Sequence, residues 1–178
     1  GEAPLMKDLQ DVTDVDLASV NYVSVIAIFI IIMLTFKSIS IPIILVSVIE
    51  FAIFLNMCIP FYTGESLPFV ASIVIGSIQL GATVDYAILM TSRYQKERLE
   101  RKKSKKEAIS IAHKTSIKSI IISGMSLFAS TFGVTISSNI DMIKSICTLL
   151  SRGAIISTIV VIFILPAMLT VFDKIICK

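Results

Sequence analysis

Charged residues are scarce in this sequence, at 16%, and tryptophan is absent. A soluble domain of this length has about 25% charged and about 45–50% apolar residues, whereas this chain is 55% hydrophobic. Its mean hydropathy of +0.90 is also too high for a soluble core. The composition excludes an ordinary soluble domain and indicates a membrane protein.

Residues for metal or phosphate chemistry are few as well. The single histidine, His113, stands alone, and the three cysteines, Cys58, Cys147 and Cys177, lack the spacing of a metal site. No Gly-Lys-Ser/Thr loop is present that would cradle a phosphate. The sequence therefore predicts no metal site, no cofactor, no ATP hydrolysis and no binding to nucleic acid.

Long apolar runs make up most of the sequence. Five of them can cross a bilayer, which takes about 20 helical residues. They cover residues 18–36, 39–61, 67–92, 117–136 and 153–172. Strands are excluded because lipid does not tolerate open sheet edges. We predict an all-α polytopic membrane protein whose transmembrane domain spans residues 18–178.

The basic residues are distributed unevenly between the two ends of these runs. The segment 93–116, predicted to be a loop, and its flank hold most of them: Arg93, Lys96, Arg98, Arg101, Lys102, Lys103, Lys105, Lys106, Lys114 and Lys118. With Lys37, Lys174 and Lys178, thirteen basic residues fall on one side, and Lys7, Lys144 and Arg152 on the other. Because positive residues stay in the cytoplasm, we expect an external amino terminus and a cytoplasmic carboxyl terminus.

The first residues, GEAPLMKDLQDVTDVD, are too polar for a signal peptide. We interpret residues 1–17 as the end of an extracellular domain or as a linker. A chain of five crossings that starts outside is an unusual unit, so we expect a fragment or a processed product of a larger transporter, with a separate subunit as the alternative.

The segment 104–114 is predicted to be a short amphipathic helix on the membrane surface.

The fourth run carries small residues at alternating steps of three and four, which places them on one helix face. We call them the serine face: Ser116, Ser119, Ser123, Ser126, Ser130, Gly133 and Ser137. Small residues let helices approach closely, and hydroxyls bond across the contact. Two interpretations stay open, a plain packing seam or a seam that also leads water or protons to a buried acid. We expect this face to pack against the third run.

The third run has a broad polar face that includes an aspartate. Gly76, Gln79, Thr83 and Tyr86 follow steps of three and four, and Ser77, Gly81 and Asp85 form an adjoining row. A charged residue in mid-bilayer costs about 2.5–3.5 kcal/mol on insertion scales, so it faces the bundle interior and marks function. A carboxyl that gains and loses a proton inside a membrane is what a proton-driven pump requires, although a structural hydrogen-bonding role is the alternative.

The remaining candidates support this polar centre. Glu50 is the other acid inside a span, and it either bonds to a neighbouring helix or lines a path. With Gln79, Thr83, Ser119, Ser123 and Ser126 it completes the set of candidate relay or path-lining residues. Gly76, Gly81, Gly124 and Gly133 are predicted helix-packing positions. An intramembrane aspartyl protease is disfavoured because it needs two aspartates, and only Asp85 lies within a span.

Several motifs resemble the MMPL branch of the resistance–nodulation–division (RND) superfamily. GATVDY, residues 81–86, resembles the Gly-x-x-x-Asp feature of the superfamily, with the Asp-Tyr form of that branch. FKSISIPI (36–43), DYAILMTSRYQKE (85–97), Ser123-Gly124 and the late ILPAML (164–169) are similar to other elements of the family. Together they cover most of residues 19–174.

The resemblance implies part of a proton-motive-force-driven exporter of lipids or other hydrophobic compounds in a bacterial cell membrane, not an enzyme. It places the chain as the last five helices of one half, the carboxyl-terminal one. Asp85 and Tyr86 match the family's proton relay, which pairs the aspartate of one half with the tyrosine of the other. The implied partner is a second transmembrane half, in the same or another chain, with its own Asp-Tyr pair. The alternative is a membrane scaffold or lipid sensor on the same fold, since fold alone does not fix function.

The charge distribution makes a prediction about topology. In intact cells, an impermeant thiol reagent should label a cysteine placed at Gly64 and leave one placed at Ser104 unlabelled. Labelling at Ser104 with none at Gly64 would invert the arrangement.

Overall fold

The computed structural model describes residues 2–64 and 69–176, and for residues 2–18, 69–70 and 72–74 it describes the backbone alone. The described residues form helices and no strand. The elements are α1 (Glu2–Phe36), α2 (Ser40–Thr63), α3 (Phe69–Gln95), a π-helical turn (Lys96–Glu100), α4 (Lys105–Ser137), α5 (Asp141–Val171) and α6 (Asp173–Ile176). The prediction of an all-α polytopic membrane protein is confirmed.

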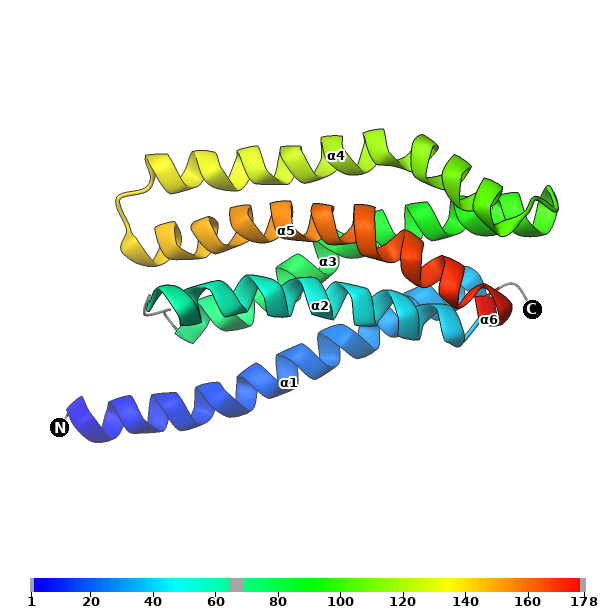
Figure 1. The fold of residues 1–178 in the computed structure, drawn as a ribbon. Helices are drawn as coiled ribbons and strands as arrows, with labels where there is room; N and C mark the ends of the chain where they lie inside the picture. The colour runs from blue at the N-terminus through cyan, green and yellow to red at the C-terminus, as the bar shows by residue number, and fades with distance from the viewer. Residues whose placement is uncertain (1, 65–68, 177–178) are drawn as a thin grey trace.

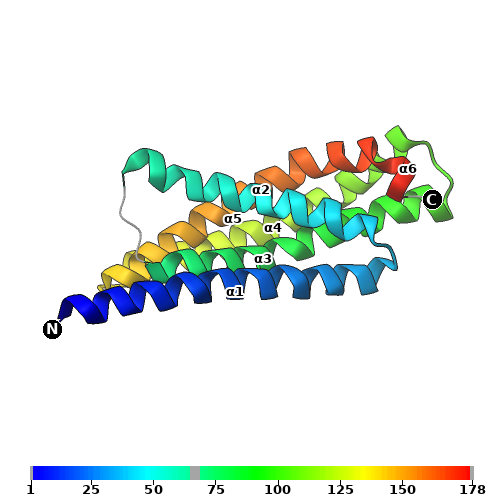
Figure 2. The ribbon, with the colours of Figure 1, turned by 90° about the horizontal axis from the view of Figure 1, so that it is seen from below.

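The five long helices run side by side in an elongated bundle (Figure 1). The amino terminus lies at one end of the bundle and the carboxyl terminus at the other. α3 contacts each of the other four long helices, and α5 contacts α2, α3 and α4. Seen from below, α3 lies with α1 on one side and with α2, α4 and α5 on the other (Figure 2). The buried apolar core sits mainly where α2, α3 and α5 meet.

Four segments of the described chain are long and apolar enough to cross a membrane: Ser19–Phe36 in α1, Ser40–Thr63, Lys105–Ser137 and Asp141–Val171. α3 carries the polar residues Gln79, Thr83 and Asp85, and several side chains of its first two turns lie outside the described residues. α3 nevertheless runs through the bundle beside all four (Figures 1 and 2). A membrane crossing by residues 67–92 stays a prediction.

The segment before the fourth span differs from the prediction of a loop with a separate surface helix. α4 is continuous from Lys105, where Ser104 and Glu107 form a capping box that satisfies free N–H groups of the first turn. No glycine or proline interrupts residues 105–123. Ala108 and Ala112 are fully buried, so this stretch packs inward as part of the same helix. The basic segment therefore extends a membrane-crossing helix.

α4 and α5 approach most closely at Gly124. A Cβ atom on Gly124 would lie 2.1 Å from Oγ1 and 3.2 Å from Cβ of Thr158 on α5. Nearer the basic end, a ring nitrogen of His113 hydrogen-bonds the backbone oxygen of Ile162 at 3.2 Å. These contacts hold α4 against α5 along its length, which gives the lone histidine a structural role.

The contact at Gly124 makes a prediction about stability. Gly124→Ala should lower the free energy of unfolding by about 1–3 kcal/mol, because the added methyl group overpacks the interface with Thr158. The matched control is Gly133→Ala on the same helix, where no atom lies within 4 Å of an added Cβ. There alanine should stabilise the helix by up to about 1 kcal/mol through its better propensity. Thermal unfolding in detergent measures both, and equal effects would contradict the close approach.

Candidate functional site

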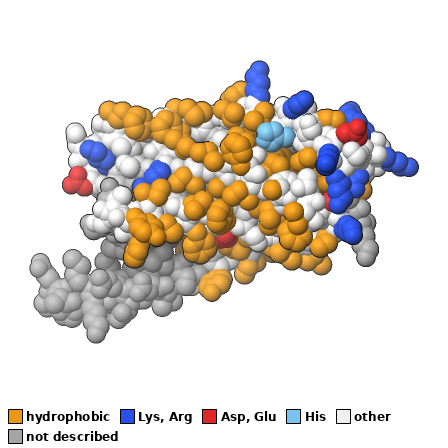
Figure 3. Space-filling view, in the orientation of Figure 1, with side chains coloured by type: hydrophobic (Ala, Val, Ile, Leu, Met, Phe, Trp, Pro, Cys, Tyr) orange, Lys and Arg blue, Asp and Glu red, His pale blue; other side chains and the backbone are white. Residues whose placement is uncertain are grey.

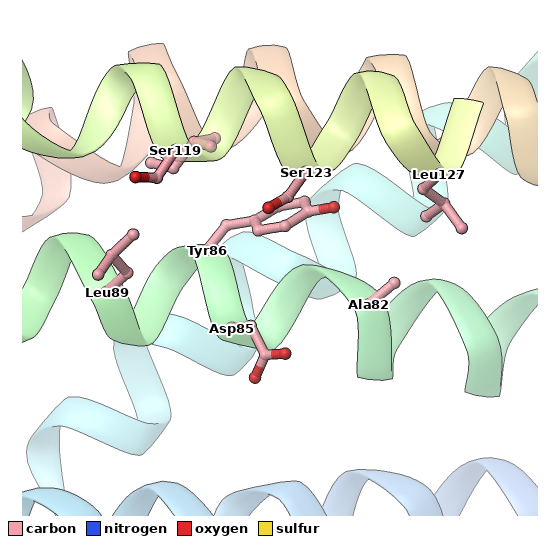
Figure 4. Close-up of a pocket in the computed structure, with 8 residues that line it drawn as sticks. Ala82, Asp85, Tyr86, Leu89, Ser119, Ser123 and Leu127 are labelled. Atoms are coloured by element: carbon pink, nitrogen blue, oxygen red, sulfur yellow. The ribbon is translucent and has the colours of Figure 1, made fainter. Parts of the chain in front are cut away.

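A cavity of about 320 Å³ lies between α3 and α4. It combines four polar side chains with an apolar remainder (Figure 4). Its lining residues are Ala82, Asp85, Tyr86, Leu89, Ser119, Ile120, Ser123 and Leu127. The structure thus brings the predicted relay pair together with two of the predicted path-lining serines.

Asp85 and Tyr86 point to different sides of α3. The Tyr86 ring is buried and extends towards α4 beside Ser123, whereas the Asp85 carboxyl points away from α4 (Figure 4). This follows from the rotation of about 100° between consecutive helical residues. The pair can therefore address two different partners, as the sequence predicts.

The Asp85 side chain is exposed, although the sequence predicted that it would face the bundle interior. Within the described chain its carboxylate has no hydrogen bond or ion pair. The physical reason is that the interior face of α3 is taken by residues such as Gln79 and Ala87, both buried. Asp85 and Gly81 lie on the opposite, exposed side.

The serine face packs against α3 only in part. Ser116 is buried, and Ser119 and Ser123 line the cavity with exposed side chains, whereas Ser126, Ser130, Gly133 and Ser137 are exposed outside the cavity. The expectation that the whole face contacts α3 is wrong for the four residues outside the cavity. α4 packs mainly against α5, through the neighbouring face that contains Gly124.

Two buried hydroxyls lie towards the basic end of the cavity. Oγ1 of Thr91 on α3 and Oγ of Ser116 on α4 are fully buried and have no hydrogen-bond partner in the described chain. At this end α3 and α4 are in contact, since the Arg93 guanidinium on α3 donates to the backbone oxygen of Thr115 on α4. Ser116 lies three residues before Ser119 on α4, and Thr91 lies six residues after Asp85 on α3, where it turns away from the face that contacts α4. Buried hydroxyls without protein partners are the groups that ordered water satisfies.

Gln79 belongs to a different polar group, a buried amide network that joins α2, α3 and α5. Its Nε2 donates to Oγ of Ser157 at 2.9 Å, and its Oε1 accepts from Nδ2 of Asn56 at 2.9 Å. Nε of Arg152 donates to Oδ1 of Asn56 at 2.9 Å. A Cβ on Gly153 would lie 2.6 Å from Gln79 Oε1, so only glycine leaves room for the network.

The other predicted site residues lie outside the cavity. The Thr83 hydroxyl donates to the backbone oxygen of Gln79 at 2.6 Å, within its own helix. Glu50 is half-buried on α2, with one carboxylate oxygen buried and unpartnered in the described chain. At Gly76 an added Cβ would only touch Asn21, at 3.4 Å, and at Gly81 it would meet open space. The functional roles assigned to these residues stay predictions.

An ion cluster closes the basic end of the bundle. The Asp173 carboxylate accepts from the Tyr94 hydroxyl at 2.5 Å and from the Arg98 guanidinium at 2.8 and 2.7 Å, with Lys105 Nζ at 3.4 Å. These donors, Arg98 first, hold the pKa of Asp173 well below its usual range despite burial. Nearby, Glu97 pairs with Lys103 and Arg101 at 2.8 Å each, and the Lys103 hydrogen bond lowers its pKa. Basic side chains gather at this end of the molecule (Figure 3).

Sequence reasoning missed the amide network and the ion cluster. Asn56 and Arg152 are polar residues inside or beside apolar runs, and that signal was present in the sequence. Asp173 follows the last apolar run directly, where it resembles an ordinary helix-end residue. Only the three-dimensional arrangement shows that Tyr94, Arg98 and Lys105 converge on it.

The helices and their polar groups define a multi-pass membrane protein with an ionisable group on a central helix. The MMPL family profile matches residues 1–175, nearly the whole chain. The chain therefore belongs to the MMPL family, as the Asp-Tyr and neighbouring motifs predicted. A search of curated proteins and a search of solved structures found no match. Family membership gives the chain a transport-related role of the RND type and not an enzymatic one.

The ion cluster makes a prediction about stability and pH. Folding lowers the pKa of Asp173, so its contribution to stability is complete above the unfolded-state value of about 3.9 and is lost as the pH falls below that value. Asp173→Asn should therefore lower the free energy of unfolding by about 1.5–3 kcal/mol at every pH from 5 to 8. The difference from the unsubstituted chain should shrink below pH 4.

The matched control is Asp141→Asn, an exposed acid in the first turn of α5. Thermal unfolding in detergent across the pH range measures both variants. The assignment is contradicted if the two substitutions have the same effect, or if the effect of Asp173→Asn changes between pH 5 and 8.

Proposed function

We propose that this chain forms one half of the transmembrane proton relay of an exporter driven by the proton motive force. Asp85 carries the proton, and Tyr86 is the hydrogen-bonding partner for the aspartate of the other half. The exported compounds are lipids or other hydrophobic molecules. The lipid class rests on family membership, and the roles of Asp85 and Tyr86 rest on the geometry of the cavity together with the Asp-Tyr motif.

The exposure of Asp85 is the observation that carries the proposal. α3 runs among membrane-crossing helices, so an exposed carboxylate in its middle would face hydrocarbon at a cost of about 2.5–3.5 kcal/mol or more. Alanine would avoid that cost. Asp85 is therefore expected to be covered by another polar surface, where it meets a proton donor or acceptor.

The surroundings of Asp85 favour a second set of helices as that cover. The exposed serines 126, 130 and 137, with Gly81 and Gly133, continue the polar face on both helices. Small and hydroxylated residues of this kind permit close helix contact in lipid. We propose that a second half with its own Asp-Tyr pair, in the same or another polypeptide, packs here. Tyr86 of this half then serves the partner's aspartate.

The buried hydroxyl of Ser116 supports access for protons from the basic end. It lies about one turn of α4 from Ser119 of the cavity, on the side towards the ion cluster. Ordered water at such a group would connect Asp85 with the side that carries the basic residues. By the charge rule this side is the cytoplasm of a bacterial cell, and the amino terminus is external.

The proposal predicts the effect of removing the titratable group. Asp85→Asn keeps the shape of the side chain but cannot bind and release a proton, so it should lower proton-driven export in the complete transporter by about 10²-fold or more. Tyr86→Phe should impair export less, because water can replace the hydroxyl. Export into vesicles with an imposed pH gradient measures both effects, at matched protein levels in the membrane.

Ser126→Ala is the matched control, because Ser126 lies on the same exposed face but outside the cavity. It should export normally. Normal export by Asp85→Asn at normal abundance would contradict the relay. The scaffold or lipid-sensor function would then remain, since a sensor can lose Asp85 and still bind lipid.

A further inference from the structure

A second cavity lies far from Asp85 along the chain, where α2 begins and α5 ends. It has a volume of about 280 Å³ and is mostly apolar. α2 contributes Ile43 and Ile44, and the opposite wall consists of Met168, Phe172 and Ile175. We call it the α2–α6 groove, because α6 contacts α2 at this place (Figure 1).

The groove opens to the surroundings of the bundle. Ile43 is 54% exposed and Ile175 is 52% exposed. The hydroxyl of Ser47, which also lines the groove, donates to the backbone oxygen of Ile43 at 2.7 Å. The first two turns of α2 belong to a membrane-crossing segment. The medium at the mouth of the groove is therefore the bilayer, whose apolar component is acyl chains.

Two exposed lysines adjoin the lining residues of the groove in the chain, and we call them its rim. Lys37 precedes Ser40 by three positions, and Lys174 directly precedes Ile175. The acid next to Lys174 is Asp173, whose charge is already matched by Arg98 and Lys105. The rim therefore keeps its positive charge. Basic pockets between membrane-crossing helices bind the phosphate headgroups of anionic lipids.

We propose that the α2–α6 groove is a binding site for an anionic phospholipid of the adjacent leaflet. One acyl chain occupies the apolar groove, and the phosphate lies against Lys37 and Lys174. A zwitterionic lipid is bound less well, because its own cation opposes the two lysines. The site involves α2, α5 and α6, whereas the proposed proton site involves α3 and α4, so the two proposals stand independently.

Photo-crosslinking in lipid nanodiscs tests the site with the full chain. The probes are phosphatidylglycerol and phosphatidylcholine with the same diazirine-bearing acyl chain, and mass spectrometry locates the labelled residues. Phosphatidylglycerol should label residues 40–47 and 168–175 roughly ten-fold more than phosphatidylcholine, since each lysine near a membrane surface favours anionic lipid several-fold. Equal labelling by the two lipids, or labelling spread evenly over exposed helix faces, overturns the proposal.

Two pairs of variants separate the groove from its rim. Ile43→Trp fills the groove and should abolish labelling by both lipids, whereas Phe54→Trp, exposed on the same helix but outside the groove, should not. Replacing both Lys37 and Lys174 by Gln should reduce phosphatidylglycerol labelling to the phosphatidylcholine level. Lys144→Gln, at the far end of α5, should leave labelling unchanged.

The lysine variants decide the matter if Ile43→Trp does not fold, because they leave the apolar groove intact. An undiminished preference for phosphatidylglycerol in the double lysine variant overturns the headgroup assignment. An equal loss of labelling in Lys144→Gln overturns it as well, because general surface charge would then explain the preference.

Discussion

Hydrocarbon offers no hydrogen bonds, so every polar group on a membrane-crossing helix must find its partner within protein or water. Most threonine hydroxyls with described side chains meet that constraint inside their own helix, by donating to the carbonyl one turn earlier, as Thr158 does to Ala154 at 2.7 Å. The amides of Asn56 and Gln79 meet it across three helices. Asp85, the acid at the cavity, has no partner in the described chain, and this is why we propose that another polar surface covers it.

The two sides of α3 consequently differ in how completely their polar groups are hydrogen-bonded. Towards α2 and α5, the Asn56–Gln79–Ser157 contacts and the room left by Gly153 fix three helices in one arrangement. Towards α4, the contact opens into a cavity, and the buried Ser116 hydroxyl one turn away on α4 has no partner in the described chain. Satisfied polar networks rigidify a core, whereas partly satisfied ones admit water. A stiff α2–α3–α5 unit therefore carries the titratable residue at its edge, beside a looser boundary with α4.

The sequence was sufficient to predict the helices and the central aspartate, because both depend on local pattern: the length of an apolar run and the cost of an acid within it. The sequence was not sufficient to predict which helices contact each other. The serine face was predicted to meet α3, yet α4 packs mainly against α5, with the close fit of Gly124 and Thr158, and only Ser116 of the face is buried. Gln79 was predicted to be a relay or path-lining residue because it shares a face with Tyr86, and its contacts with Asn56 and Ser157 could not be read from that spacing. Periodicity assigns residues to a face, and packing against residues distant in sequence decides what the face meets.

The continuity of α4 has a mechanical consequence. From Lys105, which contacts Asp173, to Ser119 at the cavity, the helix runs for about 21 Å at 1.5 Å per residue without a glycine or proline at which to bend. Such a segment is stiff along its length. A movement of its basic end relative to α3 would therefore be carried to Ser119 and not absorbed by a bend. The width of the cavity beside Asp85 and Tyr86 thus depends on the position of the basic start of α4, which lies outside the apolar layer.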